Sequence, residues 1–286
     1  MDYSRYFSNF ALVFNKNLTF QALKKLSFFL LLSMLVCIGC QWKYQSPDEP
    51  ETSGEIALER FDRMEYLYLT SGDFAALQQM KTQYPIETRT LIEDVLQLGR
   101  VDEPDINTRF LMFFQDSTLQ ALMQGVNEQY KDVEDINEEL TKSFANLTTK
   151  IPGLEIPRIY TQIGSLDQSV VVDDSLVGIS LDKYLGADYP IYQKYGYTEK
   201  QRSTMTRQYI VPDCLSFYLL RHYPLPKEDF DSLELRYEHM ARIQYVVNQA
   251  MEKRIFTSEY VVNVEKYMRQ HRDVGYDELL SAKNHQ

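Results

Sequence analysis

The stretch RIYTQIGSLDQSVVVDDSLVGISLDKYLGADYPIYQKY, residues 158–195, decides the fold, because its pattern predicts paired strands. The β-branched run 170–172 is followed by the polar step 173–175 and by a second apolar run, residues 176–181. Two short apolar runs separated by Asp and Ser predict a β-hairpin. Gly178 lies inside the second run, which indicates a bulge or a close approach of another group to the backbone.

The sequence on both sides of this stretch has the apolar spacing of helices. Asp73, Asp116 and Ser258 stand where residues that cap helices are expected. Gly and Pro are sparse, which argues against an all-β architecture. We therefore predict an α+β fold, with one mostly helical domain over residues 55–286 built around a small β-sheet. The segments expected to be helical are 56–69, a helix after Asp73, 88–98, 116–130, 132–147, 213–222, 233–255 and a helix after Ser258.

The composition is that of a globular protein with an acidic surface. The 286 residues are 44% hydrophobic and carry a formal net charge of -11. Nucleic-acid binding needs clusters of Lys and Arg to contact phosphates, and the sequence does not contain such clusters. The same negative charge argues against electrostatic docking to anionic lipid, so attachment to a membrane needs another device.

The amino-terminal residues supply that device. Lys24 and Lys25 precede an uncharged run, residues 26–36, which has the layout of a secretory signal peptide and is short for a membrane span. The run leads into CIGC, which looks like a bacterial lipobox. We therefore expect a lipoprotein signal peptide over residues 1–40 and a lipid, palmitate included, on Cys40. The alternative is an uncleaved anchor helix or a buried amphipathic segment.

Residues 41–54, QWKYQSPDEPETSG, are polar, contain two prolines and show no periodicity. This composition is typical of a flexible tether between a lipid and a folded domain. After processing, Cys40 would carry lipid and only Cys214 would remain, so an internal disulfide is not expected. The apolar helical surroundings of Cys214 predict a buried, unreactive thiol.

Three short stretches carry a family resemblance. They are RFDR at residues 60–63, YTQIG at 160–164 and VDDSLVGISLDKYLG at 172–186. Together with the lipobox, they resemble the GldB gliding-motility lipoprotein family of the Bacteroidota over roughly residues 55–255. The resemblance implies an accessory lipoprotein of the cell envelope, on the periplasmic side of the inner or outer membrane, connected with gliding and the associated secretion apparatus.

Families that resemble GldB include predicted zinc peptidases with a helical His-Glu-x-x-His motif. Two His one turn apart chelate Zn²⁺ while the Glu activates water. The comparable helix here, residues 206–217, contains no His, so the resemblance implies a degenerate zincin-like fold without metal or other cofactor. His222 and His239, with Glu238 beside the second, are the remaining candidates for a metal site with atypical ligands.

Several other residues are candidates for binding. Asp173 and Asp174 suit acid–base chemistry or Ca²⁺, although Asp in a turn also serves the backbone by hydrogen bonding. Asp182 is a candidate for contacting a partner, or for capping the segment after Leu181. Tyr184 and Tyr192 belong to a group of tyrosines that suits stacking on a glycan or a peptide, or covering an open edge of the sheet.

These observations favour a non-catalytic lipoprotein that works by binding other envelope proteins in the gliding and secretion machinery. Two alternatives remain at this point. One is a metal-dependent hydrolase with unusual ligands, and the other is a glycan-binding lipoprotein of a nutrient-uptake system.

Overall fold

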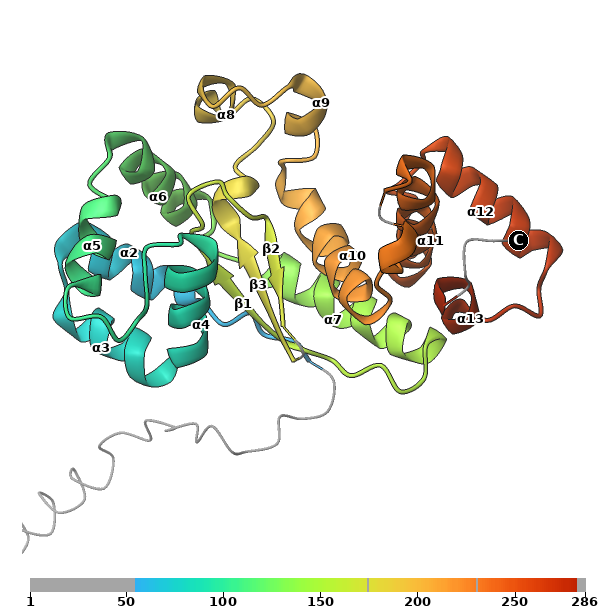
Figure 1. Ribbon diagram of the computed structural model, residues 1–286, viewed down its shortest axis with the longest axis horizontal. Helices are drawn as coiled ribbons and strands as arrows, with labels where there is room; N and C mark the ends of the chain where they lie inside the picture. The colour runs from blue at the N-terminus through green and yellow to red at the C-terminus, as the bar shows by residue number, and fades with distance from the viewer. Residues whose placement is uncertain (1–54, 174, 230, 282–286) are drawn as a thin grey trace, which may run out of the picture. The chain divides into compact units, whose positions relative to one another are not determined.

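The computed structural model describes residues 55–173, 175–229 and 231–281, which belong to one compact unit, Thr52–Gln286 (Figure 1). The predicted signal peptide, Cys40, the predicted tether and Asp174 lie outside the described residues. The described chain is mostly helical around a three-stranded sheet, so the predicted α+β fold class is confirmed. Its elements are α2 (Phe61–Ser71), α3 (Phe74–Gln83), α4 (Pro85–Arg89), the π-helix η1 (Thr90–Val95), α5 (Ile106–Phe113), α6 (Ser117–Gln129), α7 (Glu134–Lys150), β1 (Arg158–Gln162), β2 (Val170–Val172), β3 (Leu176–Ser180), η2 (Leu181–Lys183), α8 (Pro190–Lys194), α9 (Glu199–Arg202), η3 (Arg207–Tyr209), α10 (Ile210–His222), η4 (Lys227–Asp229), α11 (Leu233–Met251), α12 (Glu259–Gln270) and α13 (Tyr276–Ser281).

The sheet has the strand order β1-β3-β2. β2 and β3 are antiparallel and form the predicted hairpin, with Val172 opposite Val177. β1 and β3 are parallel, so their carboxyl ends meet at the same edge of the sheet. The loop after β1 and the segment after β3 therefore start side by side.

A short extended segment adds to the outer edge of β1. The Glu59 N–H donates to the carbonyl of Ile159, and the Thr161 N–H donates to the carbonyl of Glu59, both over 2.9 Å. The prediction of a helix from Ile56 was wrong for this reason, since the backbone here pairs with the sheet and α2 begins only at Phe61.

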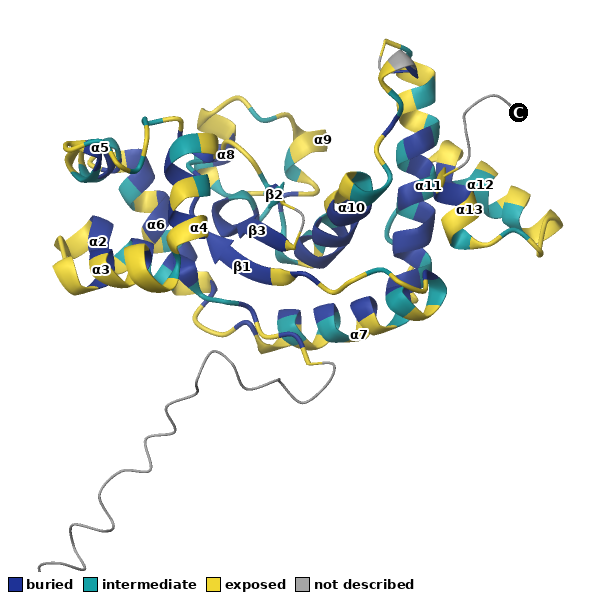
Figure 2. Cartoon of the chain, turned by 60° about the horizontal axis from the view of Figure 1, so that its bottom comes forward, coloured by how far each residue is buried: buried dark blue, intermediate teal, exposed yellow. Residues whose placement is uncertain are grey.

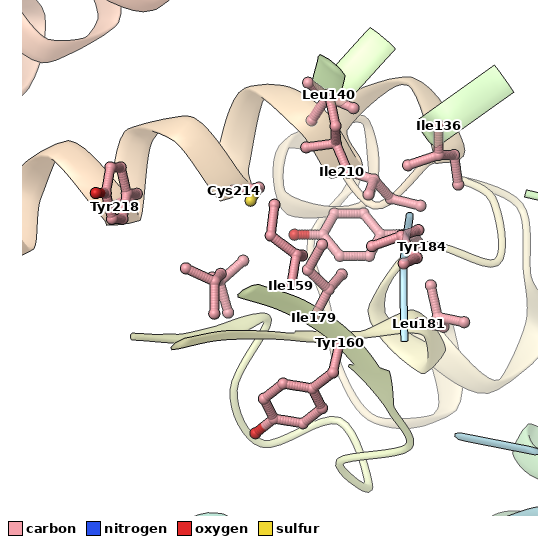
Figure 3. Close-up of a cluster of buried hydrophobic side chains, with 14 of the residues drawn as sticks. Ile136, Leu140, Ile159, Tyr160, Ile179, Leu181, Tyr184, Ile210, Cys214 and Tyr218 are labelled. Carbon is pink, nitrogen blue, oxygen red and sulfur yellow. The ribbon is translucent and has the colours of Figure 1, made fainter. Parts of the chain in front are cut away.

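The two faces of the sheet are covered by different helices. Ile159 and Ile179 lie on the face toward α7 and α10, whereas Tyr160 points to the opposite side (Figure 3). On that opposite side, the Phe61 ring of α2 meets the Tyr160 ring edge-on, with centroids 6.0 Å apart. β1 after its first residue and β3 are therefore buried on both faces, whereas β2 is half-buried after Val170, as the dark blue and teal in Figure 2 show.

Cys214 of α10 lies within the first of these interfaces. Its side chain is 0% exposed, and burial raises the pKa of the thiol far above its usual value. The prediction of a buried thiol is confirmed, and the thiolate that a nucleophile requires is disfavoured at this position.

The predicted helix caps are also confirmed. Asp73 accepts a hydrogen bond from the Ala75 N–H over 2.8 Å, and Asp116 accepts one from the Thr118 N–H over 2.8 Å. The Ser258 side chain caps α12 in the same way, because its hydroxyl accepts a hydrogen bond from the Val261 N–H over 3.4 Å. The expected helix 88–98 is instead divided between α4 and the π-helix η1, which ends at Val95. None of the described helices is long and apolar enough to cross a membrane.

Gly178 is the predicted point of close approach. It stands opposite Tyr160 across the β1–β3 pair, and a methyl group added to its Cα would overlap the Tyr160 ring. The ring therefore fills the space that a side chain at position 178 would otherwise take.

Gly178→Ala should lower the free energy of unfolding by about 1–3 kcal/mol, because an extra methyl group forces the buried ring or the strand to shift. Denaturant unfolding measures the change. Gly275→Ala is the matched control, since nothing lies within 4 Å of the added atom, and it should change stability by less than about 0.5 kcal/mol. Equal stability of the two variants would contradict the packing described.

Candidate functional site

Two acidic residues of α2 hold the strand β1 and its continuation. Thr161 Oγ1 donates a hydrogen bond to Asp62 Oδ1. One turn later on the helix, Glu65 Oε2 accepts a hydrogen bond from the Ile163 N–H over 2.7 Å. Both carboxyl groups are buried, so α2 contributes polar as well as apolar contacts to this end of the sheet.

A third acidic residue reaches the same loop from β3. Asp182 lies in η2, directly after β3, and its side chain is 0% exposed. Its Oδ1 accepts from the Gly164 N–H over 2.8 Å, and its Oδ2 accepts from the Leu166 N–H over 2.6 Å. The three stretches that carry the family resemblance thus meet at the carboxyl ends of β1 and β3.

Burial dominates the electrostatics of this cluster. Desolvation raises the pKa of Glu65 well above its usual value, and the negative charges of Asp62 and Asp182 raise it further, while the Ile163 N–H opposes the shift. Desolvation also raises the pKa of Asp182, against the two backbone donors. Glu65 Oε1 is buried without a hydrogen-bond partner in the described residues, which favours the protonated acid.

The loop held in this way has an unusual backbone. Ser165 and Leu166 adopt φ values of 52° and 65°, in the left-handed region that non-glycine residues rarely occupy. Such conformations cost on the order of 1–3 kcal/mol each and persist only where surrounding contacts impose them. The hydrogen bonds that the N–H groups of Ile163, Gly164 and Leu166 donate to the buried carboxyl groups are such contacts.

A second irregular segment faces the loop. In a π-helix, each N–H donates to the carbonyl five residues earlier in the chain. At the end of η1, the Leu96 N–H donates to the Leu91 carbonyl in this way, with 2.8 Å between nitrogen and oxygen. The next residue, Gln97, has a φ of 51°. π-helical turns are rare and are frequent at functional sites, where they redirect the chain.

The two irregular segments and a pair of tyrosines enclose a surface cavity of about 330 Å³. Three of the four non-glycine residues with positive φ in the described chain line this cavity. Strained backbone that gathers at one cavity marks a candidate binding site. The cavity is lined by Val95, Leu96, Gln97, Ser165, Leu166, Asp167, Tyr195 and Tyr197.

The Tyr197 side chain is held by hydrogen bonds and by contact with Lys183, whereas the Tyr195 side chain is exposed. The Tyr197 hydroxyl donates to the carbonyl of Leu166 over 2.9 Å, and Lys183 Nζ donates to the same carbonyl over 3.1 Å. Lys183 also lies over the Tyr197 ring, 4.8 Å from its centroid. The Tyr195 side chain, in contrast, is 49% exposed and is available to a ligand.

Three of the binding residues predicted from the sequence are buried and do not line the cavity. Asp182 holds the loop, and the Tyr192 hydroxyl donates to the carbonyl of Asp182 over 2.6 Å. The Tyr184 hydroxyl donates to Asp213 Oδ2 over 2.9 Å. All three side chains are buried, so a role of these residues in binding stays a prediction and would be indirect.

Asp173 lies elsewhere. It is exposed in the turn between β2 and β3, at the opposite end of β3 from Asp182, and its N–H donates to the carbonyl of Leu176 over 2.9 Å. The structure therefore does not bring Asp173 and Asp182 together. Asp174 and Cys40 lie outside the described residues.

The histidines considered as metal ligands have other neighbours. His239 Nε2 lies 2.8 Å from the carbonyl of Tyr223, and the His222 ring packs on Tyr218 with centroids 4.4 Å apart. In the described ranges, no group of three or more His, Cys, Asp or Glu side chains is arranged to hold a metal ion.

The family is decided by comparison with known families. The model of the gliding motility protein GldB matches residues 43–254, which is well over half of the chain. This chain belongs to the GldB gliding-motility family. The match covers the entire candidate site and ends after α11, so α12 and α13 of this GldB-family protein lie beyond it. Neither the curated proteins nor the solved structures contain a significant match to the chain.

Sequence reasoning missed most residues that line the cavity of this GldB-family protein. Gln97 lies in a segment whose apolar spacing predicts a regular α-helix. The π-helix η1, which changes the direction of the backbone before Gln97, has no signature in the sequence. Ser165 and Asp167 are polar turn residues after a predicted strand, a signal that could have identified the loop. Glu65 resembled an ordinary polar residue of an amphipathic helix.

Asp182→Asn should destabilise the GldB-family protein by about 1–3 kcal/mol, because an amide has one acceptor oxygen and turns its NH₂ group toward the second buried N–H. Denaturant unfolding measures the loss, and hydrogen exchange of the amides at 164–167 should accelerate. Asp188→Asn, at a nearby exposed position, should leave both unchanged. If the two variants behave alike, Asp182 does not hold the loop.

Asp213 predicts a pH dependence of stability. Burial raises its pKa from 3.8 to about 6, with the hydrogen bond from Tyr184 opposing the shift. Since the pKa is higher in the folded state, its stabilising contribution is complete below about pH 4 and is lost as the pH rises through about 6. Between pH 4 and 7, the wild type should lose up to about 3 kcal/mol relative to Asp213→Asn. Parallel stability curves in denaturant titrations would contradict the shift.

Proposed function

We propose that this GldB-family chain is a lipid-anchored protein of the cell envelope that acts by binding other envelope proteins and performs no catalysis of its own. The observation that carries the proposal is that the buried carboxyl groups accept hydrogen bonds from the backbone. Glu65 and Asp182 bind the backbone of the loop 163–166 instead of facing the cavity. Groups committed to shaping a loop prepare a rigid surface for recognition, whereas acid–base catalysis requires them to reach a substrate.

The helix comparable to that of zinc peptidases supports the same conclusion. In α10, the positions toward the sheet are held by apolar groups, among them Ile210 and Cys214 (Figure 3). Asp213 in its first turn is engaged by Tyr184. A packed apolar face replaces the space that a metal ion and its water would need.

The anchor we propose is a lipid on Cys40. A tether over residues 41–54 would allow the folded part to stand up to about 50 Å from the membrane surface, since an extended residue spans about 3.5 Å. This reach suits a protein that meets partners in the periplasm or at the opposite membrane.

The proposal predicts that Cys40→Ser abolishes incorporation of labelled fatty acid and releases the chain from the membrane fraction of the producing bacterium. In intact cells, crosslinking of the wild type should capture a defined set of envelope proteins, and the variant should capture fewer because it is no longer held near them. Cys37→Ser is the matched control and should retain the label.

Two results would count against the proposal. Lipid label that persists in Cys40→Ser would reject the anchor. Stoichiometric Zn²⁺ in the purified protein that disappears on His239→Ala, together with hydrolytic activity, would reject the non-catalytic role and favour the hydrolase.

A further inference from the structure

The cavity between η1 and the loop 163–167 has three kinds of lining. Val95, Leu96 and Leu166 are buried apolar residues that form its base. The tyrosines 195 and 197 supply aromatic surface. Gln97, Ser165 and Asp167 add polar groups. An apolar base, aromatic surface and a carboxylate together match a side chain with an aliphatic stem and a planar cationic head group.

The charges around the cavity favour a cation as the head group. Asp167 is exposed and makes no ion pair with another described residue. Asp94 is also exposed, and it lines an adjacent hollow of about 440 Å³ that shares Gln97 with the cavity. Of the nearby basic groups, Arg100 is paired with Asp102 over 3.0 Å, and the Lys183 ammonium group, which keeps its charge, donates to the Leu166 carbonyl and the Tyr197 hydroxyl. The net charge of -11 attracts a basic partner over a longer range.

We propose that this cavity binds an arginine side chain from an exposed segment of a partner protein. The aliphatic stem packs on Leu96 and Leu166, and the guanidinium group stacks on the Tyr195 ring while it donates to the Asp167 carboxylate. Arginine fits better than lysine, because its planar head group both stacks on aromatic rings and donates two parallel hydrogen bonds to a carboxylate.

The backbone around the cavity adds to this fit. Gln97, Ser165 and Leu166 are held in left-handed conformations before any partner arrives, and Asp182 fixes the loop from beneath. A preformed site does not have to be ordered on binding, so more of the interaction energy appears as affinity. This inference rests on the proposed function and names the chemistry that the partner presents to the site.

The test uses the full lipidated chain in detergent micelles and four fluorescein-labelled peptides of one length. They carry arginine, lysine, citrulline or alanine at the central position, and citrulline keeps the shape of arginine without its charge. Fluorescence anisotropy should show binding of the arginine peptide, about tenfold weaker binding of the lysine peptide, and no saturable binding of the other two.

Variants of the site make the assignment specific. Asp167→Asn and Tyr195→Ala should each weaken binding of the arginine peptide about tenfold or more. Asp188→Asn and Tyr237→Ala alter exposed residues that do not line the cavity and should leave binding unchanged. Thermal unfolding should be the same for all four variants and the wild type.

Some outcomes would overturn the inference. The inference is wrong if the arginine and alanine peptides bind equally, or if Asp167→Asn binds the arginine peptide as well as the wild type does. It is also wrong if a disaccharide binds saturably and displaces the arginine peptide from Tyr195. If envelope proteins are captured equally by the wild type and Asp167→Asn, this site is wrong and the proposed function stands. If the wild type captures no envelope protein, the proposed function fails, whatever the peptides show.

Discussion

The structure depends on buried carboxyl groups that bind backbone N–H groups at the carboxyl ends of two parallel strands. Asp182 and Glu65 together satisfy three N–H groups of the loop after β1. Removing these acceptors would leave polar backbone groups buried without partners, which costs more than the hydrogen bonds themselves contribute. The loop can therefore hold two left-handed residues in succession, and the surface cavity exists because the loop has this shape.

The same interactions bear on the non-catalytic role that we propose for this GldB-family chain. Catalytic carboxyl groups have raised pKa values and also reach a substrate. Here the raised pKa of Glu65 and of Asp182 follows first from burial, and Glu65 Oε2 and both Asp182 carboxyl oxygens accept backbone N–H groups, while Glu65 Oε1 has no partner in the described residues. The raised pKa values of these carboxyl groups thus result from their burial in the packed structure. The cavity beside this loop presents the exposed Tyr195 ring and the Asp167 carboxylate.

Local patterns in the sequence predicted the parts of the fold that depend on neighbouring residues. The hairpin between β2 and β3 follows from β-branched runs separated by turn residues, and the caps at Asp73, Asp116 and Ser258 follow from hydrogen bonds within one helical turn. The close approach at Gly178 was also visible, because a glycine in an apolar strand needs a packing reason. The family was evident from motifs that are contiguous in the chain.

The tertiary structure alone decided what depends on distant segments. Residues 56–59 are not helical because their backbone N–H groups have distant partners: Glu59 pairs with β1, about a hundred residues away, and the Ile56 and Leu58 N–H groups donate to the side chains of Thr141 and Asn137 in α7. Asp182 accepts hydrogen bonds from the loop after β1 because the parallel pairing of β1 and β3 places that loop beside it. The cavity joins Gln97 to Tyr195 across a similar distance in sequence. The sequence determined which local structures form and which family the chain belongs to. Only packing could decide which segments meet, since such contacts depend on the shapes of whole elements and not on the spacing of residues within one of them.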